Sequence, residues 1–174
     1  YQIGRYANTN TAQLEYSNNP NGEGTGKTPE SKVNAWTFPA IISKVDGKDN
    51  TKTLDGAKFV LSRNPNLKVS DMKCDENGVP ANTTDLIQFF APADQSSTAA
   101  YDIATAEQIA AGTHITYVIE LGSKVLAGFG EHAYYLYETK APNGYNLLAE
   151  PVKFTFHASA TMDLRTDPAW ITLN

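Results

Sequence analysis

The segment Tyr134-Tyr135-Leu136-Tyr137-Glu138-Thr139-Lys140-Ala141-Pro142-Asn143-Gly144-Tyr145 decides the fold of this 174-residue chain. Its aromatic and apolar residues favour a β-strand, and the Pro-Asn-Gly sequence then ends the strand in a turn. The strand period of two places two sets of side chains on opposite faces: Tyr134, Leu136 and Glu138 on one, Tyr135 and Tyr137 on the other. The predicted strand therefore carries a carboxylate into an apolar core, where a carboxylate without a partner is costly.

This segment resembles the E-box of sortase-assembled Gram-positive pilins, Tyr-x-Leu-x-Glu-Thr-x-Ala-Pro-x-Gly-Tyr, at every fixed position from Tyr134 to Tyr145. The resemblance implies an all-β fold, an Ig-like β-sandwich of the inverse immunoglobulin type with a short helical insertion, like the B-type (CnaB) domain of collagen adhesins. In that family a glutamate promotes a spontaneous isopeptide bond between a lysine on the first strand and an asparagine on the last. The resemblance thus implies that role for Glu138.

Two further residues fit the remaining positions of the crosslink. Lys44 interrupts the apolar run Phe38–Gly47, which resembles the family's first strand and ends in a turn at Asp46-Gly47. The run Leu54–Leu61 resembles the second strand, so the order of elements also fits. Asn174 ends the β-prone run Ala169–Asn174, and a regular strand would point it into the core with Lys44 and Glu138. We expect Lys44 to be the nucleophile and Asn174 the acceptor.

The proposed bond needs these three residue types. An amine attacks a carboxamide carbon only when it is neutral, and burial disfavours the charged forms of both Lys44 and Glu138. A neutral carboxylic acid can hydrogen-bond the carboxamide oxygen of Asn174, polarise it, and pass a proton to the departing ammonia. Each residue taken alone has a plainer explanation: a snorkelling lysine, a solvent-exposed glutamate and a frayed terminal asparagine. The order of all three with the E-box favours the crosslink, which forms once per molecule and makes the chain no enzyme.

Composition agrees with a secreted, β-rich module, and the resemblance implies a place on the Gram-positive cell surface, in a fimbria attached to the cell wall. The single cysteine excludes an intrachain disulfide, and the net charge of −5 argues against nucleic acid or an anionic membrane as a partner. We find no apolar stretch long enough to span a membrane and no signal peptide, so we expect a mature fragment without membrane insertion. The three histidines are isolated from one another, which predicts no metal site, and no cofactor is expected.

The chain divides near residue 33. Residues 1–33 are expected to be a tail, the last strand of a preceding pilin domain followed by a linker at Ser17–Gly26, and residues 34–174 the CnaB-like E-box domain. We expect this domain to be the C-terminal shaft or stalk domain of a pilin backbone subunit, whose partners are neighbouring subunits joined by sortase. Within it we predict a short helix between a Thr105 cap and Gly112, and a strand over His114–Glu120.

Other functions stay open at this stage. The long loops of residues 62–125 could bind a host protein or glycan, which would make the chain an adhesin or minor-pilin module. The run Gly22–Thr28 resembles the end of a phosphate-binding loop, but no apolar helix follows it. Cys74 could be a nucleophile paired with a distant histidine, although a lone cysteine is more often incidental.

Overall fold

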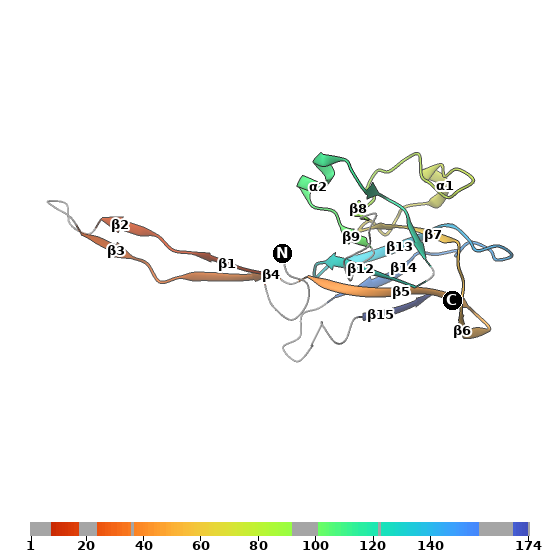
Figure 1. Ribbon diagram of the computed structural model, residues 1–174, viewed down its shortest axis with the longest axis horizontal. Coiled ribbons are helices and arrows are strands. Elements are labelled where there is room, and N and C mark those ends of the chain that lie inside the picture. The colour runs from red at the N-terminus through yellow and green to blue at the C-terminus, as the bar shows by residue number, and fades with distance from the viewer. Residues whose placement is uncertain are drawn as a thin grey trace.

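The computed structural model describes residues 8–17, 24–35, 37–91, 101–121, 123–156 and 169–173. Two β-sheets pack face to face as a sandwich, and a long two-stranded β-ribbon extends from it, formed by residues near the N-terminus (Figure 1). The secondary structure is mostly β with two short helices. The all-β sandwich predicted from the sequence is therefore confirmed.

The larger sheet contains the first and last strands of the sandwich side by side. Its strand order is β10-β8-β9-β12-β5-β15, and β6 pairs with the far end of β5. The strands are β5 (Phe38–Asp46), β6 (Asp49–Thr53), β8 (Phe89–Phe90), β9 (Tyr101–Ile103), β10 (Ile115–Thr116), β12 (Ser123–Phe129) and β15 (Ala169–Leu173). Strands β5 and β15 run parallel, and their register pairs the Cα of Lys44 with that of Leu173. This arrangement is the one expected of a domain whose first and last strands are to be joined.

The smaller sheet carries the E-box strand in its interior. Its strand order is β11-β7-β13-β14, with strands β7 (Ala57–Ser62), β11 (Ile119–Leu121), β13 (Ala133–Lys140) and β14 (Val152–Thr155). All pairings in this sheet are antiparallel, and Glu138 of β13 lies opposite Phe59 of β7. Because β13 has neighbours on both sides, its backbone hydrogen-bonding groups are satisfied and its inward side chains lie deep in the core.

The core between the sheets is rich in aromatic rings. Phe129 packs edge-on against Tyr134 and nearly parallel to Phe156, with ring centroids 5.0 Å apart in both pairs. Tyr134 and Leu136 are fully buried, as the strand period predicts. The opposite face of β13 is also covered, because Tyr137 packs with Val60 and Met72 in a second apolar cluster and donates a hydrogen bond to the carbonyl of Asn64. The E-box strand is thus buried on both faces at its C-terminal half.

The two helices lie in the region between β7 and β11. Helix α2 (Ala106–Ala111) begins at Thr105 with a capping box and ends at Gly112 with φ +69°, so the predicted helix is confirmed. Helix α1 (Val69–Met72) was not predicted. The predicted strand over His114–Glu120 was wrong as a single element. It is divided into β10 and β11, which belong to different sheets, and the Thr116 hydroxyl bonds the N–H and carbonyl of Val118 at the break.

The ribbon consists of four short strands in two pairs. β1 (Asn8–Ala12) pairs with β4 (Ser31–Ala35), and β2 (Glu15–Ser17) pairs with β3 (Thr25–Lys27), all antiparallel. The linker expected at Ser17–Gly26 therefore includes strand residues at both ends, because cross-strand pairing with β2 orders a Gly-rich run that has no strand pattern of its own. Most side chains of the ribbon are exposed, and it projects well away from the sandwich (Figure 1).

Candidate functional site

Lys44 lies inside the sandwich near the C-terminal end of β5. Burial alternates along this strand, and Phe38, Ala40 and Ile42 share the inner face with Lys44. The Lys44 side chain is only 4% exposed. A lysine at that depth is rare unless its amine has a specific partner. The sequence-based prediction that Lys44 points into the core agrees with this geometry.

Glu138 lies on the facing sheet and is also buried, with 1% of its surface exposed. The backbone N–H of Leu148 donates a hydrogen bond of 2.7 Å to its Oε2 atom. Its Oε1 atom is buried and has no hydrogen-bond partner among the described residues. The carboxyl group is therefore held through one oxygen, while the other is left available.

The protonation of Glu138 follows from its surroundings. Burial raises the pKa of the Glu138 carboxyl above its ordinary value of 4.5, and the Leu148 N–H and the charge of Lys44 offset this only in part. Because Oε2 already accepts the Leu148 N–H, a protonated carboxyl would carry its hydrogen on Oε1. That oxygen would then be a donor with no acceptor yet in place. A carboxamide oxygen is a suitable acceptor.

Asn174 lies outside the described residues. The residue before it, Leu173, is the last of β15, and its Cα pairs with that of Lys44. Strand β15 runs parallel to β5 along five paired residues, from Ala169 opposite Ala40 to this last pair. The backbone of the final strand is therefore brought next to the lysine, and the placement of the asparagine side chain stays a prediction.

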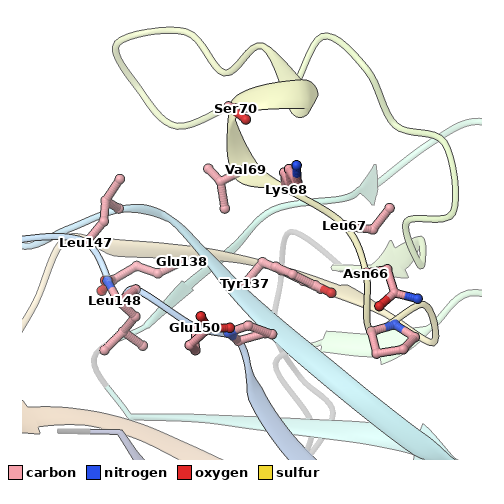
Figure 2. Close-up of a pocket in the computed structure, with 13 residues that line it drawn as sticks. Asn66, Leu67, Lys68, Val69, Ser70, Tyr137, Glu138, Leu147, Leu148 and Glu150 are labelled. Atoms are coloured by element: carbon pink, nitrogen blue, oxygen red, sulfur yellow. The ribbon is translucent and has the colours of Figure 1, made fainter.

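A pocket of about 580 Å³ opens beside Glu138. One wall is the segment Pro65–Ser70, which includes the start of α1, and the other is the segment Leu147–Pro151, which connects the E-box to β14. Figure 2 shows the Glu138 side chain directed toward Leu148, while Tyr137 points the opposite way, toward Asn66. No sequence pattern predicted this pocket, because its walls come from two loops of irregular composition.

The E-box turn also has the predicted form. Gly144 has φ +85°, which only glycine adopts readily, and the Tyr145 N–H donates to the Pro142 carbonyl at 3.1 Å. The chain then passes back along β13, which brings the Leu148 N–H to Glu138. Sequence reasoning missed the part played by Leu148, since a backbone donor leaves no trace in residue type.

The alternative sites have little support in the described structure. Burial and the neighbouring Asp75 raise the pKa of the Cys74 thiol, which disfavours the reactive thiolate. Within the resembled phosphate-binding run, Thr25–Lys27 is a strand of the ribbon and no helix begins there. The described residues contain no group of three His, Cys, Asp or Glu that could hold a metal ion.

The lengths of the helices and the exposed apolar side chains bear on other functions. Within the ranges the structure describes, neither helix is long and apolar enough to cross a membrane. In the described part of residues 62–125, the exposed large apolar side chains are Val79 and Ile109, and none is aromatic. The aromatic side chains described there are either buried (Phe89) or half-buried (Phe90, Tyr101 and Tyr117).

Comparisons with known proteins find a similar domain and similar folds. Residues 97–168 match the family model of the SpaA domain, described as a prealbumin-like fold domain. A search of proteins with curated function finds no match. Similar solved structures include the C-terminal fragment of the major pilin GBS80 of Streptococcus agalactiae, at 21% identity and a TM-score of 0.55, with 99% of this chain and 56% of that one covered.

Two further pilin structures resemble the chain. BcpA, the major pilin subunit of Bacillus cereus, has 18% identity and a TM-score of 0.51, with 99% of this chain and 40% of that one covered. The pilus 2b backbone protein of group B streptococcus has 24% identity and a TM-score of 0.46, and the match covers 99% of this chain and 50% of that one. This chain thus spans about half of the length of these backbone proteins or less. The match over residues 97–168 includes Glu138 and the whole E-box.

Proposed function

We propose that the chain is the C-terminal shaft or stalk domain of a Gram-positive pilin backbone subunit, stabilised by an isopeptide bond that forms between Lys44 and Asn174 under the influence of Glu138. The observation that carries this proposal is the buried pair of Lys44 and Glu138 on facing sheets, in which the Oε1 atom of Glu138 has no partner among the described residues. A buried lysine and a buried carboxyl group do not stabilise a fold by their burial alone, because removing them from water costs free energy. Their burial is explained if the carboxamide of Asn174 lies beside both side chains.

The reaction would proceed by amide exchange. The neutral Lys44 Nζ attacks the carboxamide carbon of Asn174 while the protonated Glu138 Oε1 donates a hydrogen bond to the carboxamide oxygen. Glu138 then relays a proton from the attacking nitrogen to the leaving nitrogen. A new C–N bond forms, the original C–N bond breaks, one ammonia departs, and Glu138 ends protonated as it began. No cofactor, metal or oxidant is required.

Folding would accelerate the crosslinking reaction by positioning the reacting groups. Parallel pairing of β15 with β5 holds the two backbones at ladder distance, and Leu148 fixes the carboxyl group. Such intramolecular placement can contribute roughly 7–11 kcal/mol toward the barrier relative to free reactants. The reaction takes place once per molecule, so the chain is not an enzyme with turnover.

The bond would have a mechanical role. It would link the first and last strands of the sandwich, so that tension applied through the two ends of the domain would bypass most of the hydrogen-bonded sheets. The same role fits a surface-anchored fimbria whose neighbouring subunits are joined by sortase. Similarity to pilin backbone proteins supports this setting, while attachment to the cell wall and polymerisation are part of the proposal.

Intact mass measurement followed by peptide mapping tests the chemistry. We expect a deficit of one ammonia, located on a peptide that joins Lys44 to Asn174. Lys44→Ala and Glu138→Ala should each restore the unmodified mass in a folded chain. Lys58→Ala is the matched control, because Lys58 lies on β7 and is only partly buried, and it should keep the deficit. An unmodified wild-type mass, or a bond that survives Glu138→Ala, would contradict the proposal.

A further inference from the structure

A hydrogen bond links the ends of the two strands that carry Lys44 and Glu138. The phenol hydroxyl of Tyr145 donates to Oδ2 of Asp46 at 2.8 Å. Asp46 is the last residue of β5, two residues after Lys44, and Tyr145 follows the E-box turn, seven residues after Glu138. The bond therefore joins two segments that are 99 residues apart in the sequence, the end of β5 in the larger sheet and the turn that follows β13 of the smaller sheet.

Both partners are fixed by their own chain segments. The Lys48 N–H donates to Oδ1 of Asp46 at 2.9 Å, which orients the carboxylate within the β5–β6 turn. On the other side, the bond between Tyr145 and Pro142 closes the E-box turn and fixes the Tyr145 backbone relative to β13. The bond thus connects two rigid turns, and a shift of one turn relative to the other would break it.

The chemistry favours a persistent bond. The hydrogen bonds from the Lys48 N–H and from Tyr145 hold the pKa of Asp46 below its ordinary value of 3.8, so this carboxyl stays ionised at neutral pH. A hydroxyl bound to an ionised carboxylate forms a stronger hydrogen bond than a neutral pair does. Lys52 lies 3.7 Å from the same Oδ2 atom, but its side chain is largely exposed and the ion pair contributes little.

We propose that the Tyr145–Asp46 hydrogen bond is a positioning device for the crosslinking reaction, holding the end of β5 against the E-box turn so that the Lys44 amine and the Glu138 carboxyl keep their reactive separation. This inference rests on the proposed function. The two strands share no backbone ladder, because they lie in different sheets, so their relative position depends on side-chain packing and on links such as this one. A misplacement of about 1 Å can slow a positioned reaction by about 100-fold.

A residue that only stabilised the fold would leave different evidence from one that positions the reaction. The test follows the rate of crosslinking after the full chain is synthesised in a cell-free reaction and translation is stopped. The crosslinked fraction is read from the loss of ammonia and from the faster migration on a denaturing gel. The rate is measured where circular dichroism shows every variant fully folded, since under those conditions added stability alone does not change it.

We expect Tyr145→Phe, which removes only the hydroxyl, to slow crosslinking by about 3- to 10-fold, in line with the contribution of one partly exposed hydrogen bond. Asp46→Ala should slow it at least as much. The double variant should be no slower than Asp46→Ala, because both changes remove the same bond.

Two controls separate positioning from general stability. Tyr137→Phe removes a hydroxyl bond of 2.7 Å from the same strand region, but its acceptor is the carbonyl of Asn64 and not the β5 segment. Lys52→Ala removes the exposed ion pair to Asp46 and keeps the Tyr145 bond. Both should crosslink at the wild-type rate.

The outcomes distinguish the two proposals. If the wild-type chain crosslinks and Tyr145→Phe does so at the same rate, or if Tyr137→Phe slows it equally, the positioning role is wrong and the crosslink stands. If the wild-type chain never loses ammonia, the positioning role and the proposed function both fail.

Discussion

The ribbon and the sandwich are both built from β-strands, yet they are stabilised in different ways. In the sandwich, inward side chains from two sheets form an apolar core, in which residues such as Leu126 and Phe129 are fully buried. In the ribbon, Leu14 and Val33 are 63% and 65% exposed, and the described ion pairs, Lys27–Glu15 and Lys32–Glu30, lie at the surface. A two-stranded ribbon of this kind is marginal in water without further packing.

This contrast shows which region of the molecule can bury ionisable side chains. Only the sandwich surrounds Lys44 and Glu138 with apolar atoms, and burial there raises the pKa of the Glu138 carboxyl. Lys27 and Lys32 of the ribbon are exposed to solvent. The buried pair of Lys44 and Glu138 therefore depends on the two-sheet core, and the described residues of the ribbon contain no equivalent.

Replacing one lysine in each region by alanine should give the largest difference in the free energy of unfolding. Lys44→Ala should remove the crosslink and lower the free energy of unfolding by on the order of 5 kcal/mol, the chain-entropy value for a covalent loop of about 130 residues. Lys32→Ala in the ribbon removes only an exposed ion pair and should have almost no effect. Urea titration of both variants measures the difference. Equal losses would mean that Lys44 takes part in no covalent link.

A matched pair of leucines tests the packing difference at two positions other than Lys44 and Glu138. Leu126→Ala leaves a cavity in the core and should cost about 2–5 kcal/mol. Leu14→Ala removes a side chain that is already mostly in water and should change stability by less than about 0.5 kcal/mol. Both are measured by thermal or urea unfolding in the Lys44→Ala background, where unfolding is free of the crosslink. A large effect of Leu14→Ala would show that the ribbon is packed against something in solution.

The pH dependence of the uncrosslinked domain tests the state of Glu138. Its folded-state pKa is raised above the ordinary 4.5, so between these two values the folded state holds a proton that the unfolded state has lost. Stability is then full below pH 4.5 and falls as pH rises through the folded pKa, with a slope of at most about 1.4 kcal/mol per pH unit.

The Lys44→Ala variant is the best chain for this measurement, because the lysine charge that lowers the pKa of Glu138 is absent. The control is Lys44→Ala with Glu138→Gln, which cannot titrate at this position and should lack that slope. Identical pH profiles for the two chains would mean that the pKa of Glu138 is the same in the folded and unfolded states.

The sequence was sufficient to predict the sandwich, the buried Lys44 and Glu138, and helix α2. Each has a local signal: alternation along β5, the E-box, and the Thr105 capping box with Gly112. Helix α1 has no such signal, because its N-cap is Lys68 and no side chain caps it. The break between β10 and β11 could not be predicted either, since a continuous apolar run does not say where the chain crosses from one sheet to the other.

Two contacts near the site could not be predicted from the sequence for a related reason. The Leu148 N–H that holds Glu138 is a backbone group, and the Tyr145–Asp46 bond joins residues 99 positions apart. Residue type and periodicity describe one segment at a time, so contacts that depend on how two turns meet in space appear only in the folded structure.

Replacing one glycine in each region should give the smallest difference in stability. Gly78 has φ +73°, and a Cβ there would lie 2.7 Å from the Cβ of Lys140 and 3.3 Å from the backbone carbon of Thr139. Gly26 in the ribbon would place a Cβ 2.7 Å from the ring of Tyr16, but this ring is exposed and free to swing away. Gly78→Ala should therefore destabilise the sandwich by at least about 1–2 kcal/mol, because backbone strain and a clash with the E-box strand act together. Gly26→Ala should leave the unfolding midpoint of the sandwich unchanged and alter only the Tyr16 environment, read by NMR. A shift of the sandwich midpoint in Gly26→Ala would mean that the ribbon and the sandwich unfold as one cooperative unit, which the exposure of the ribbon side chains argues against.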